Sequence, residues 1–440
     1  MLGGALPIII TLAGGYFLIK LRAFFLFHPI KTLKLTLSAF GSNKKSSIKS
    51  LSLALAGTLG VGNITGVAIG IMLGGAGSVF WLLVSSFFAA VLKYAESVLT
   101  VDNMRSADSS QGGMMYIIKT SFGRASEPLA IIYAVSCLIL ALFMGGALQS
   151  NTVKMTLDSA SSIPTAAIVL FVVILTTLSV KGGGEKIEKI TVVLIPLTTI
   201  IYILMSACIM ISHSDRIFAV IKLILTSAFS PLSFGGGILG FITSRCVFEG
   251  YARGILSNEA GAGTSTLAHS RNVGTTPCRE GALGMCEVFF DTVILCMLTA
   301  FSILLSVDAP WEYTSAMTLV YDAFSAVLGG AFCLPLLLSI LAFAFSTIIC
   351  WYYYGESCAR FLFGRRGVVP FFILYISFVA LGIVLNTLLI VRLTDMLLLI
   401  LSILSVGALI KNSDRVKALS EIENVISKRE FAKAREHRRR

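Results

Sequence analysis

The chain alternates between long apolar stretches and short polar connections, a pattern typical of helices that span a membrane. A spanning helix needs about 20 mainly apolar residues. One stretch, 217–248, is too long for a single span and is interrupted by SPLSFGGG. The eleven predicted spans are 5–25, 51–73, 79–100, 127–149, 163–180, 189–211, 217–248, 286–307, 329–353, 367–390 and 393–410.

Composition supports a membrane protein. Of the 440 residues, 56% are hydrophobic and 13% are charged, whereas a soluble domain has about 25% charged residues. The first stretch lacks a basic start and an evident cleavage site, so we expect an anchor rather than a signal peptide. The nine cysteines lack CxxC spacing, so we expect them to be small apolar packing residues. The four histidines are scattered and show no metal-site spacing. We therefore predict an all-α membrane protein.

Basic residues gather on one side of the predicted membrane. With the N-terminus outside, 31 of the 35 Lys and Arg residues fall on inner segments, as the positive-inside rule requires. We predict a plasma (inner) membrane location with a cytoplasmic C-terminus. The net charge of +12 then calls for no nucleic-acid partner. The basic tail, 411–440, is either a solvated tail or a short helix on anionic lipid headgroups.

Two predicted spans are interrupted by glycines. The first contains GTLGVGNITG, residues 57–66, and the second contains SPLSFGGGILG, with Pro231 and the triplet Gly235, Gly236 and Gly237. Without the N-terminal helix and basic linker (1–50), the chain divides into five spans in 51–211 and five in 212–410. Such halves have opposite topology, and a break in the first helix of each half indicates a transport site.

Glycine-rich breaks have a definite chemistry. Each glycine costs about 1 kcal/mol against alanine in a helix, and unwound backbone at membrane depth is tolerated only in protein or beside a wet cavity. Its N–H groups suit a carboxylate, and its carbonyls suit a cation such as sodium. Asn63 adds a side-chain carbonyl. The alternative is close helix packing through the small-xxx-small spacing of Gly62 and Gly66.

Four polar or aromatic residues in other spans extend this hypothesis, each with an alternative. Ser346 and Thr347 would face a cation, or bond back to their own helix. Trp351 would close a small pocket, or belong to an interfacial belt. Gln149 would contact a ligand, or simply end a helix.

Charged residues near the inner side add further candidates. Glu287 and Asp291 lie four residues apart on one helix face. Asp291 would pin helices through a hydrogen bond, an interpretation we favour over sensing the cation. Lys93 and Glu96 are expected to pair locally at the cytoplasmic edge.

The segment GYARGILSNEAGAGTSTLAHS, 250–270, combines charges with glycine turns. Arg253, Asn258, Glu259 and His269 would form a cytoplasmic gate, or a surface loop held by turns and a salt bridge. An enzyme is not indicated, because the chain lacks a GxSxG elbow and a phosphate-loop GK[ST].

Several runs resemble the alanine/glycine:cation symporter (sodium:alanine symporter) family: GTLGVGNITGVAIGIMLGGAGSVFW, LKYAES, GYARGILSNEAGAGTSTLAHS, EVFFDTVILCMLTAFSIL and AFAFSTIICWYYYGESCARFLFG. The likeness covers about residues 51–365. It implies a leucine-transporter-type fold with a 5+5 inverted repeat after one extra helix. The sequence departs in GGAGS, in GGMMYI and at Arg279, where the family would have GGPGA, GGPMYYI and Gln.

The resemblance also implies a role for each site residue. Backbone around Gly60, Gly62 and Asn63 would meet the substrate carboxylate, and Gly235 to Gly237 would supply the second break. The substrate would be bordered by Gln149, Thr347 and Trp351. Sodium would be ringed by the carbonyls of Ala56, Leu59 and Phe343 and the hydroxyls of Ser346 and Thr347.

These observations predict a sodium-coupled symporter that imports a small neutral amino acid, such as alanine or glycine, by alternating access. Its partners would be the amino acid and the lipid bilayer, and a monomer is expected. Rival interpretations are proton coupling through Asp291, a passive channel, and a membrane enzyme or scaffold that transports nothing.

Overall fold

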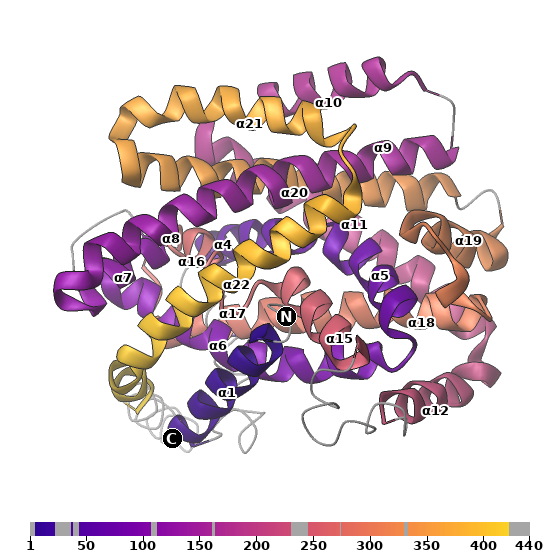
Figure 1. Ribbon diagram of the computed structural model, residues 1–440, viewed down its shortest axis with the longest axis horizontal. Coiled ribbons are helices and arrows are strands. Elements are labelled where there is room, and N and C mark those ends of the chain that lie inside the picture. Colours follow the sequence, from indigo (N-terminus) through magenta and orange to yellow (C-terminus); the bar gives the residue numbers. More distant parts are fainter. Residues whose placement is uncertain are drawn as a thin grey trace, which may run out of the picture.

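The computed structural model describes residues 5–22, 37, 44–106, 112–160, 163–229, 245–272, 274–329 and 333–421, and every regular element within them is helical (Figure 1). Six continuous helical segments are long and apolar enough to cross a membrane. The all-α class is thus confirmed for this part of the chain, while the count of eleven spans and the 5+5 repeat stay predictions. The six segments are Ser78–Ser106, Gly123–Asp158, Gly183–Ser212, Pro277–Ser306, Leu334–Gly382 and Thr387–Lys411.

Several of these segments consist of α-helices joined by π-helical or 3-10 turns. The elements are α6 (Ser78–Ser106), α8 (Ser126–Leu140) with π-helix η4 (Ala141–Leu148) and α9 (Gln149–Ala160), α11 (Gly183–Ser212), α17 (Pro277–Val288) with π-helix η6 (Phe289–Cys296) and α18 (Met297–Ser306), α20 (Cys333–Phe363) joined by η9 (Gly364–Gly367) to α21 (Val368–Gly382), and α22 (Thr387–Lys411).

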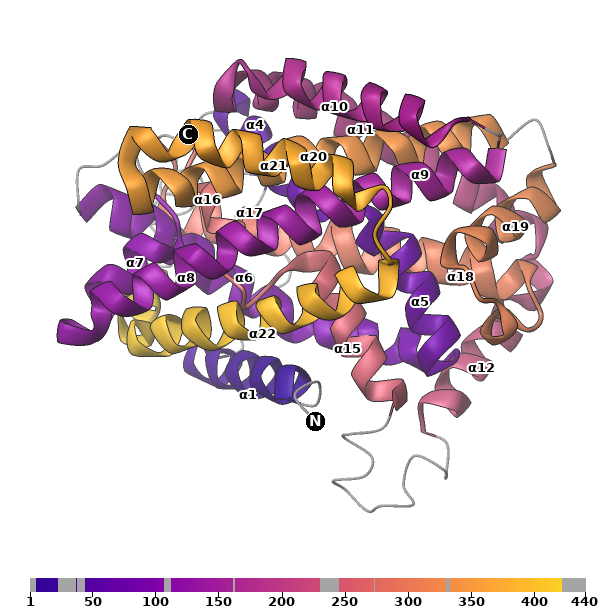
Figure 2. The same ribbon diagram turned by 45° about the horizontal axis from the view of Figure 1, so that its top comes forward.

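Shorter helices complete the described part. Helix α1 lies beside α6 and α22 at the edge of the molecule (Figure 2), and α10 packs against α21 and α11. The bounds are α1 (Ala5–Lys20), α7 (Met114–Ser121), α10 (Thr165–Val180), α12 (Ile217–Ala228) and α19 (Ala316–Leu328), with the 3-10 turns η3 (Gly123–Ala125), η5 (Ser214–Arg216) and η7 (Pro310–Glu312).

The predicted break in the first glycine-rich span is confirmed. Helix α4 (Lys44–Thr58) ends where the glycines begin, a 3-10 turn η2 (Val61–Asn63) follows, and α5 (Thr65–Gly74) resumes the path. Without a Cβ, glycine keeps more conformational freedom in the unwound chain, so this density of glycines favours unwinding over continuous helix. The unwound stretch between α4 and α5 lies inside the protein, because Leu59 and Asn63 are buried.

The predicted span 217–248 is wrong in its extent. Helix α12 ends at Ala228, and a separate helix, α15, runs from Arg245 to Asn258. The glycine triplet Gly235 to Gly237 lies outside the described residues. Hydropathy did not reveal α15 because it carries Arg245, Glu249 and Arg253. Arg253 is nevertheless buried, 2.8 Å from Asp395 of α22.

The structure places a second break directly after α15. The chain leaves the helix at Asn258, passes through residues 259–265 and enters the short helix α16 (Thr266–His269). Gly261 and Gly263 have φ of +84° and +77°, and Glu259 has φ of +54° without being glycine. Both breaks lie close together, since a Cβ on Gly62 would be 3.3 Å from the Cα of Ser257. The surface-loop interpretation of this segment is wrong, because it is buried.

The stretch between the predicted spans 286–307 and 329–353 contains α19. Ser315 caps this helix by accepting a hydrogen bond from the Thr318 amide, a common N-cap arrangement. Its buried face includes Met317, Val320 and Phe324, at helical spacing, and it packs against α5, α11 and α18. The mixture of polar and apolar residues in this stretch concealed an amphipathic helix.

Helix α6 packs between α15 and α17, and glycines of α15 and α17 form the contacts. A Cβ on any of four glycines of those two helices would lie between 2.1 and 2.6 Å from an atom of α6, closer than real contacts allow. Small residues permit this close approach of helices in membranes. The four are Gly250 and Gly254 of α15 and Gly281 and Gly284 of α17.

Candidate functional site

The first break brings a cluster of oxygen atoms together beside α20. The Thr347 hydroxyl lies 3.0 Å from the carbonyl oxygen of Ala56, 3.4 Å from that of Leu59 and 3.0 Å from that of Phe343. Ser346 donates a hydrogen bond of 2.9 Å to the Phe343 carbonyl. All five residues are buried. The structure therefore brings together the residues that the family resemblance places around sodium.

One hydroxyl proton cannot satisfy this cluster. Threonine donates a single hydrogen bond, yet its oxygen lies near three carbonyl oxygens. Several carbonyl lone pairs therefore surround one hydroxyl oxygen, and oxygen is the ligand that small hard cations prefer. Back-bonding within α20, the alternative interpretation, describes Ser346; Thr347 also reaches across to α4.

Asn63 closes the break on itself and ties it to η6. Its side-chain carbonyl accepts a hydrogen bond of 3.2 Å from the Gly60 amide, and its Nδ2 donates to Asp291 Oδ1 at 2.7 Å. Asp291 Oδ2 accepts from Ser257 at 2.6 Å and from Thr292 at 2.7 Å. Asp291 therefore ties the first break to the end of α15, beside the second break, in agreement with the favoured interpretation of this residue as a pin between helices.

Gln149 and Trp351 flank the same break from opposite elements. A Cβ on Gly60 would lie 2.6 Å from Thr347 Oγ1 and 3.3 Å from Gln149 Oε1. The Trp351 indole donates a hydrogen bond of 3.2 Å to the Gly57 carbonyl. The interfacial-belt interpretation of Trp351 is wrong, because its side chain has no exposed surface. Gln149 is also buried, at the start of α9 and in continuous helix with η4, so it does not end a helix.

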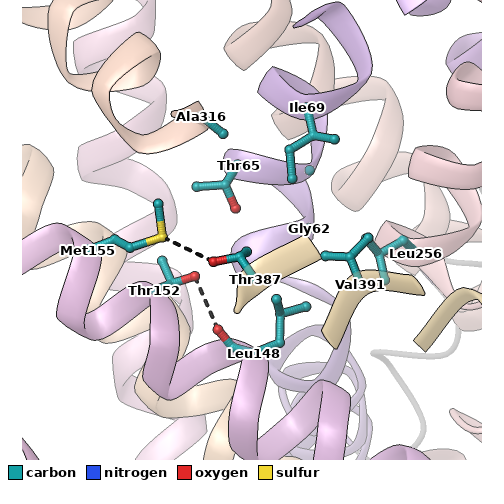
Figure 3. A pocket seen from close by; sticks show the side chains of 11 residues that line it. Gly62, Thr65, Ile69, Leu148, Thr152, Met155, Leu256, Ala316, Thr387 and Val391 are labelled. Atoms are coloured by element: carbon teal, nitrogen blue, oxygen red, sulfur yellow. Dashed lines mark hydrogen bonds between the residues drawn. The ribbon is translucent and has the colours of Figure 1, made fainter. Parts of the chain in front are cut away.

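A pocket leads to the break from the side of α5, α19 and the start of α22. Its empty space is about 370 Å³, including the mouth that opens to solvent. Figure 3 shows side chains from several elements surrounding this space, with Gly62 of the first break among the lining residues. The lining residues are Gly62, Thr65, Gly66, Ile69, Leu148, Thr152, Met155, Leu256, Ala316, Thr387 and Val391.

Sequence reasoning missed several residues of this region. Ser257 and Thr292, which hold Asp291, lie in segments that were predicted as loop and apolar span. Thr65 and Thr152 follow Gly62 and Gln149 by three residues, so helical spacing from those two candidates was an available signal. A small apolar void behind the break also brings in Tyr202 and Leu295, for which the sequence gives no signal.

Charged residues of the segments predicted to lie on the inner side are buried and paired across helices. The predicted local pair of Lys93 with Glu96 is wrong: Lys93 Nζ lies 3.3 Å from Glu287, and Glu96 Oε1 accepts the amides of Gly261 and Gly263 at 2.8 and 3.1 Å. Helical spacing favoured a pair within α6, but the partners on the neighbouring elements lie closer.

The four predicted gate residues do not form one cluster. Arg253 pairs with Asp395 of α22, while His269 lies between Glu280 at 2.6 Å and Glu287 at 3.1 Å. Asn258 donates a hydrogen bond to Thr292 at 3.1 Å. A gating role for them stays a prediction.

Replacing Asn63 with Leu is expected to abolish amino-acid uptake while the protein still inserts in the membrane. The change removes the donor to buried Asp291 and the acceptor of the Gly60 amide, and an unsatisfied buried polar group costs about 1–3 kcal/mol. Uptake by cells, normalised to protein in the membrane fraction, measures the effect. The neighbouring Ile64→Leu variant is the control, and normal uptake by Asn63→Leu would exclude the role.

Comparison with known proteins gives the wider setting of this site. The chain is 33% identical over 389 residues to an uncharacterized transporter of Haemophilus influenzae (86% of this chain and 84% of the relative). It is 31% identical over 429 residues to the uncharacterized transporter YflA of Bacillus subtilis (95% and 90%). It is 29% identical over 379 residues to the sodium/alanine symporter AgcS of Methanococcus maripaludis (83% and 82%).

A family model gives the same result over a longer stretch. The model described as the sodium:alanine symporter family matches residues 1–434. This match covers the helices that build both breaks and the whole of the oxygen cluster. The resemblance inferred from the sequence motifs is thereby confirmed, and the chain belongs to the sodium:alanine symporter family of membrane transporters.

Proposed function

We propose that this protein is a sodium-coupled symporter that imports a small neutral amino acid, alanine or glycine, across the plasma membrane. The convergence of the Ala56, Leu59 and Phe343 carbonyls on the Thr347 hydroxyl supports a sodium site. Sodium bound there would join α4 to α20 through oxygen ligands from both. The name of the relative AgcS, a sodium/alanine symporter, agrees with this choice of ion and substrate.

The substrate would bind next to the sodium, at the end of the pocket. Main-chain groups at Gly60 and Gly62 would receive its carboxylate, and Gln149, Thr347 and Trp351 would border the rest. Thr347 and Gln149 crowd the Gly60 position so closely that a single methyl group there would clash. So tight a boundary favours a substrate with a small side chain.

Binding of the two ligands would be coupled. The Gly60 amide is bonded to Asn63 in this structure, so it must be released before it can hold a carboxylate. Sodium at the neighbouring carbonyls would order the break in the arrangement that frees this amide. Each ligand would then raise the affinity of the other by the same factor, as thermodynamic linkage requires. Alternating access would follow from rocking of helices around the fixed site.

Uptake of labelled alanine and glycine into liposomes that contain the purified protein tests this proposal. Sodium outside should drive accumulation above the equilibrium level, and choline in its place should not. Accumulation driven by an inward proton gradient in choline would indicate proton coupling instead. Flux that does not saturate with amino-acid concentration and produces no accumulation would indicate a channel. Absence of any flux would indicate a protein that does not transport these amino acids.

A further inference from the structure

A group of carboxylates is buried around one lysine on the inner side of the second break. Glu96, Glu259 and Glu287 have no exposed surface, and the charge of Lys93 acts on all three. Transfer of an ionised carboxylate out of water is strongly unfavourable unless a cation or several hydrogen bonds compensate it. A single ammonium group cannot compensate three carboxylates, so the partners of each one decide its charge state.

Two of the carboxylates have more partners than the third. Glu287 lies 3.3 Å from Lys93 Nζ and 3.1 Å from His269 Nε2. Glu96 accepts two main-chain amides at Oε1, those of Gly261 and Gly263, while its Oε2 has no hydrogen-bond partner in the described part of the chain. Glu280, nearer the start of α17, bonds to His269, Ser50 and Asn272.

Glu259 is different. Its Oε2 accepts one hydrogen bond from the Thr264 hydroxyl, at 2.5 Å. Its Oε1 is buried and has no hydrogen-bond partner within the described part of the chain. Among the described residues, no basic group lies within ion-pairing distance of it. Its backbone is also held in the left-handed region, with φ of +54°, where a non-glycine residue is uncommon. A carboxylate in this place would lack the compensation that its neighbours have.

The groups that face Glu259 come from several packed elements. The charged ones are Lys93 of α6, Glu287 of α17 and Asp291 of η6. Glu96 of α6 lies beside the same segment, where it accepts the amides of Gly261 and Gly263. Neutral phenol and thiol groups complete the surroundings: Tyr133 and Cys137 of α8, and Cys350 and Tyr354 of α20. Two of these three charged neighbours are acidic, so the surroundings favour the neutral form of Glu259.

We propose that Glu259 is a proton-binding site within the second break. Its carboxyl carries a proton while residues 259–265 are buried, and it exchanges this proton with the inner side when the segment is wetted. Exposure of this segment to water rests on the alternating access of the proposed function. The protonated state of Glu259 in the closed form, in which residues 259–265 are buried, does not rest on it. Because the proton is bound in the closed form, an acidic inner compartment stabilises that form and slows its opening.

Infrared difference spectroscopy of the full-length protein in liposomes tests the protonated state at neutral pH. The wild-type spectrum is expected to contain a protonated-carboxyl C=O band that is absent from Glu259→Gln. Thr264→Val, which removes only the hydroxyl bonded to Glu259, should shift this band without removing it. The control Glu127→Gln, at an exposed carboxylate, should leave it unchanged. A band that persists in Glu259→Gln and stays in place in Thr264→Val would overturn the proposal.

Alanine uptake at fixed outer pH and varied inner pH tests the exchange. Wild type and Glu127→Gln are expected to slow down as the inner compartment becomes acidic. Glu259→Gln, which keeps the neutral form permanently, should transport at a rate independent of inner pH. Equal pH dependence of all three would contradict exchange at Glu259. Absence of any sodium-driven uptake would contradict the symport proposal, and the infrared result would still decide the protonated state.

Discussion

Gly60→Ala is expected to lower sodium-driven alanine uptake at least tenfold. The added methyl group would lie 2.6 Å from Thr347 Oγ1 and 3.3 Å from Gln149 Oε1, both of them parts of the proposed site. Overpacking of this kind costs about 1–3 kcal/mol, and about 1.4 kcal/mol corresponds to a factor of ten. The cost falls on the sodium cluster and on the substrate boundary at once. Initial uptake rates at saturating sodium measure it.

Gly15→Ala is the matched control for this substitution. Gly15 also lies in an apolar stretch, helix α1, but a Cβ there would meet no atom within 4 Å. Alanine favours helix over glycine by about 1 kcal/mol, so this variant should insert and transport like wild type. If Gly60→Ala transports at the wild-type rate, the space beside Gly60 is not the binding site.

Thr347→Val is expected to weaken sodium activation by roughly tenfold or more, with a smaller effect on uptake at very high sodium. The substitution keeps the shape of the side chain and removes the one oxygen that lies within 3.4 Å of the Ala56, Leu59 and Phe343 carbonyls. Loss of a buried polar partner costs about 1–3 kcal/mol. The sodium concentration for half-maximal alanine binding, measured at equilibrium, reports this change directly.

Ser339→Ala controls for loss of a hydroxyl from the same helix. Ser339 donates only to the Pro335 carbonyl of its own α20, at 2.8 Å, so sodium activation should be unchanged. By linkage, Thr347→Val should also weaken alanine binding at moderate sodium and leave it nearly normal at saturating sodium. Unchanged sodium activation in Thr347→Val would remove the oxygen cluster from the mechanism.

Sequence reasoning located the first break but not the second. GTLGVGNITG is recognisable as a break because its glycines lie inside an apolar span, where a loop outside the membrane is not expected. The second break, at residues 259–265, lies between charged residues and therefore looks like a cytoplasmic loop. Charged residues around this break can be buried because they form ion pairs with residues far away in the sequence, such as Arg253 with Asp395 and Lys93 with Glu287. No local sequence pattern reveals such pairs.

The site residues divide in the same way. Ala56, Leu59, Phe343, Ser346 and Thr347 were named through the family resemblance rather than through spacing, and the fold brings them together. Asp291 was recognised as an intramembrane acid. Its partner Ser257 could not be foreseen, because the contact depends on how α15 lies against η2 and η6.

The glycine contacts of α6 with α15 and α17 have a mechanical consequence. The backbones of α15 and α17 pack directly against α6 at these glycines, so one helix cannot slide or tilt against another without a steric clash. They would therefore travel as a single block during any conformational cycle. The two unwound segments lie at the margin of that block. Any movement of α4 relative to α6, α15 and α17 would therefore take place at the first of them.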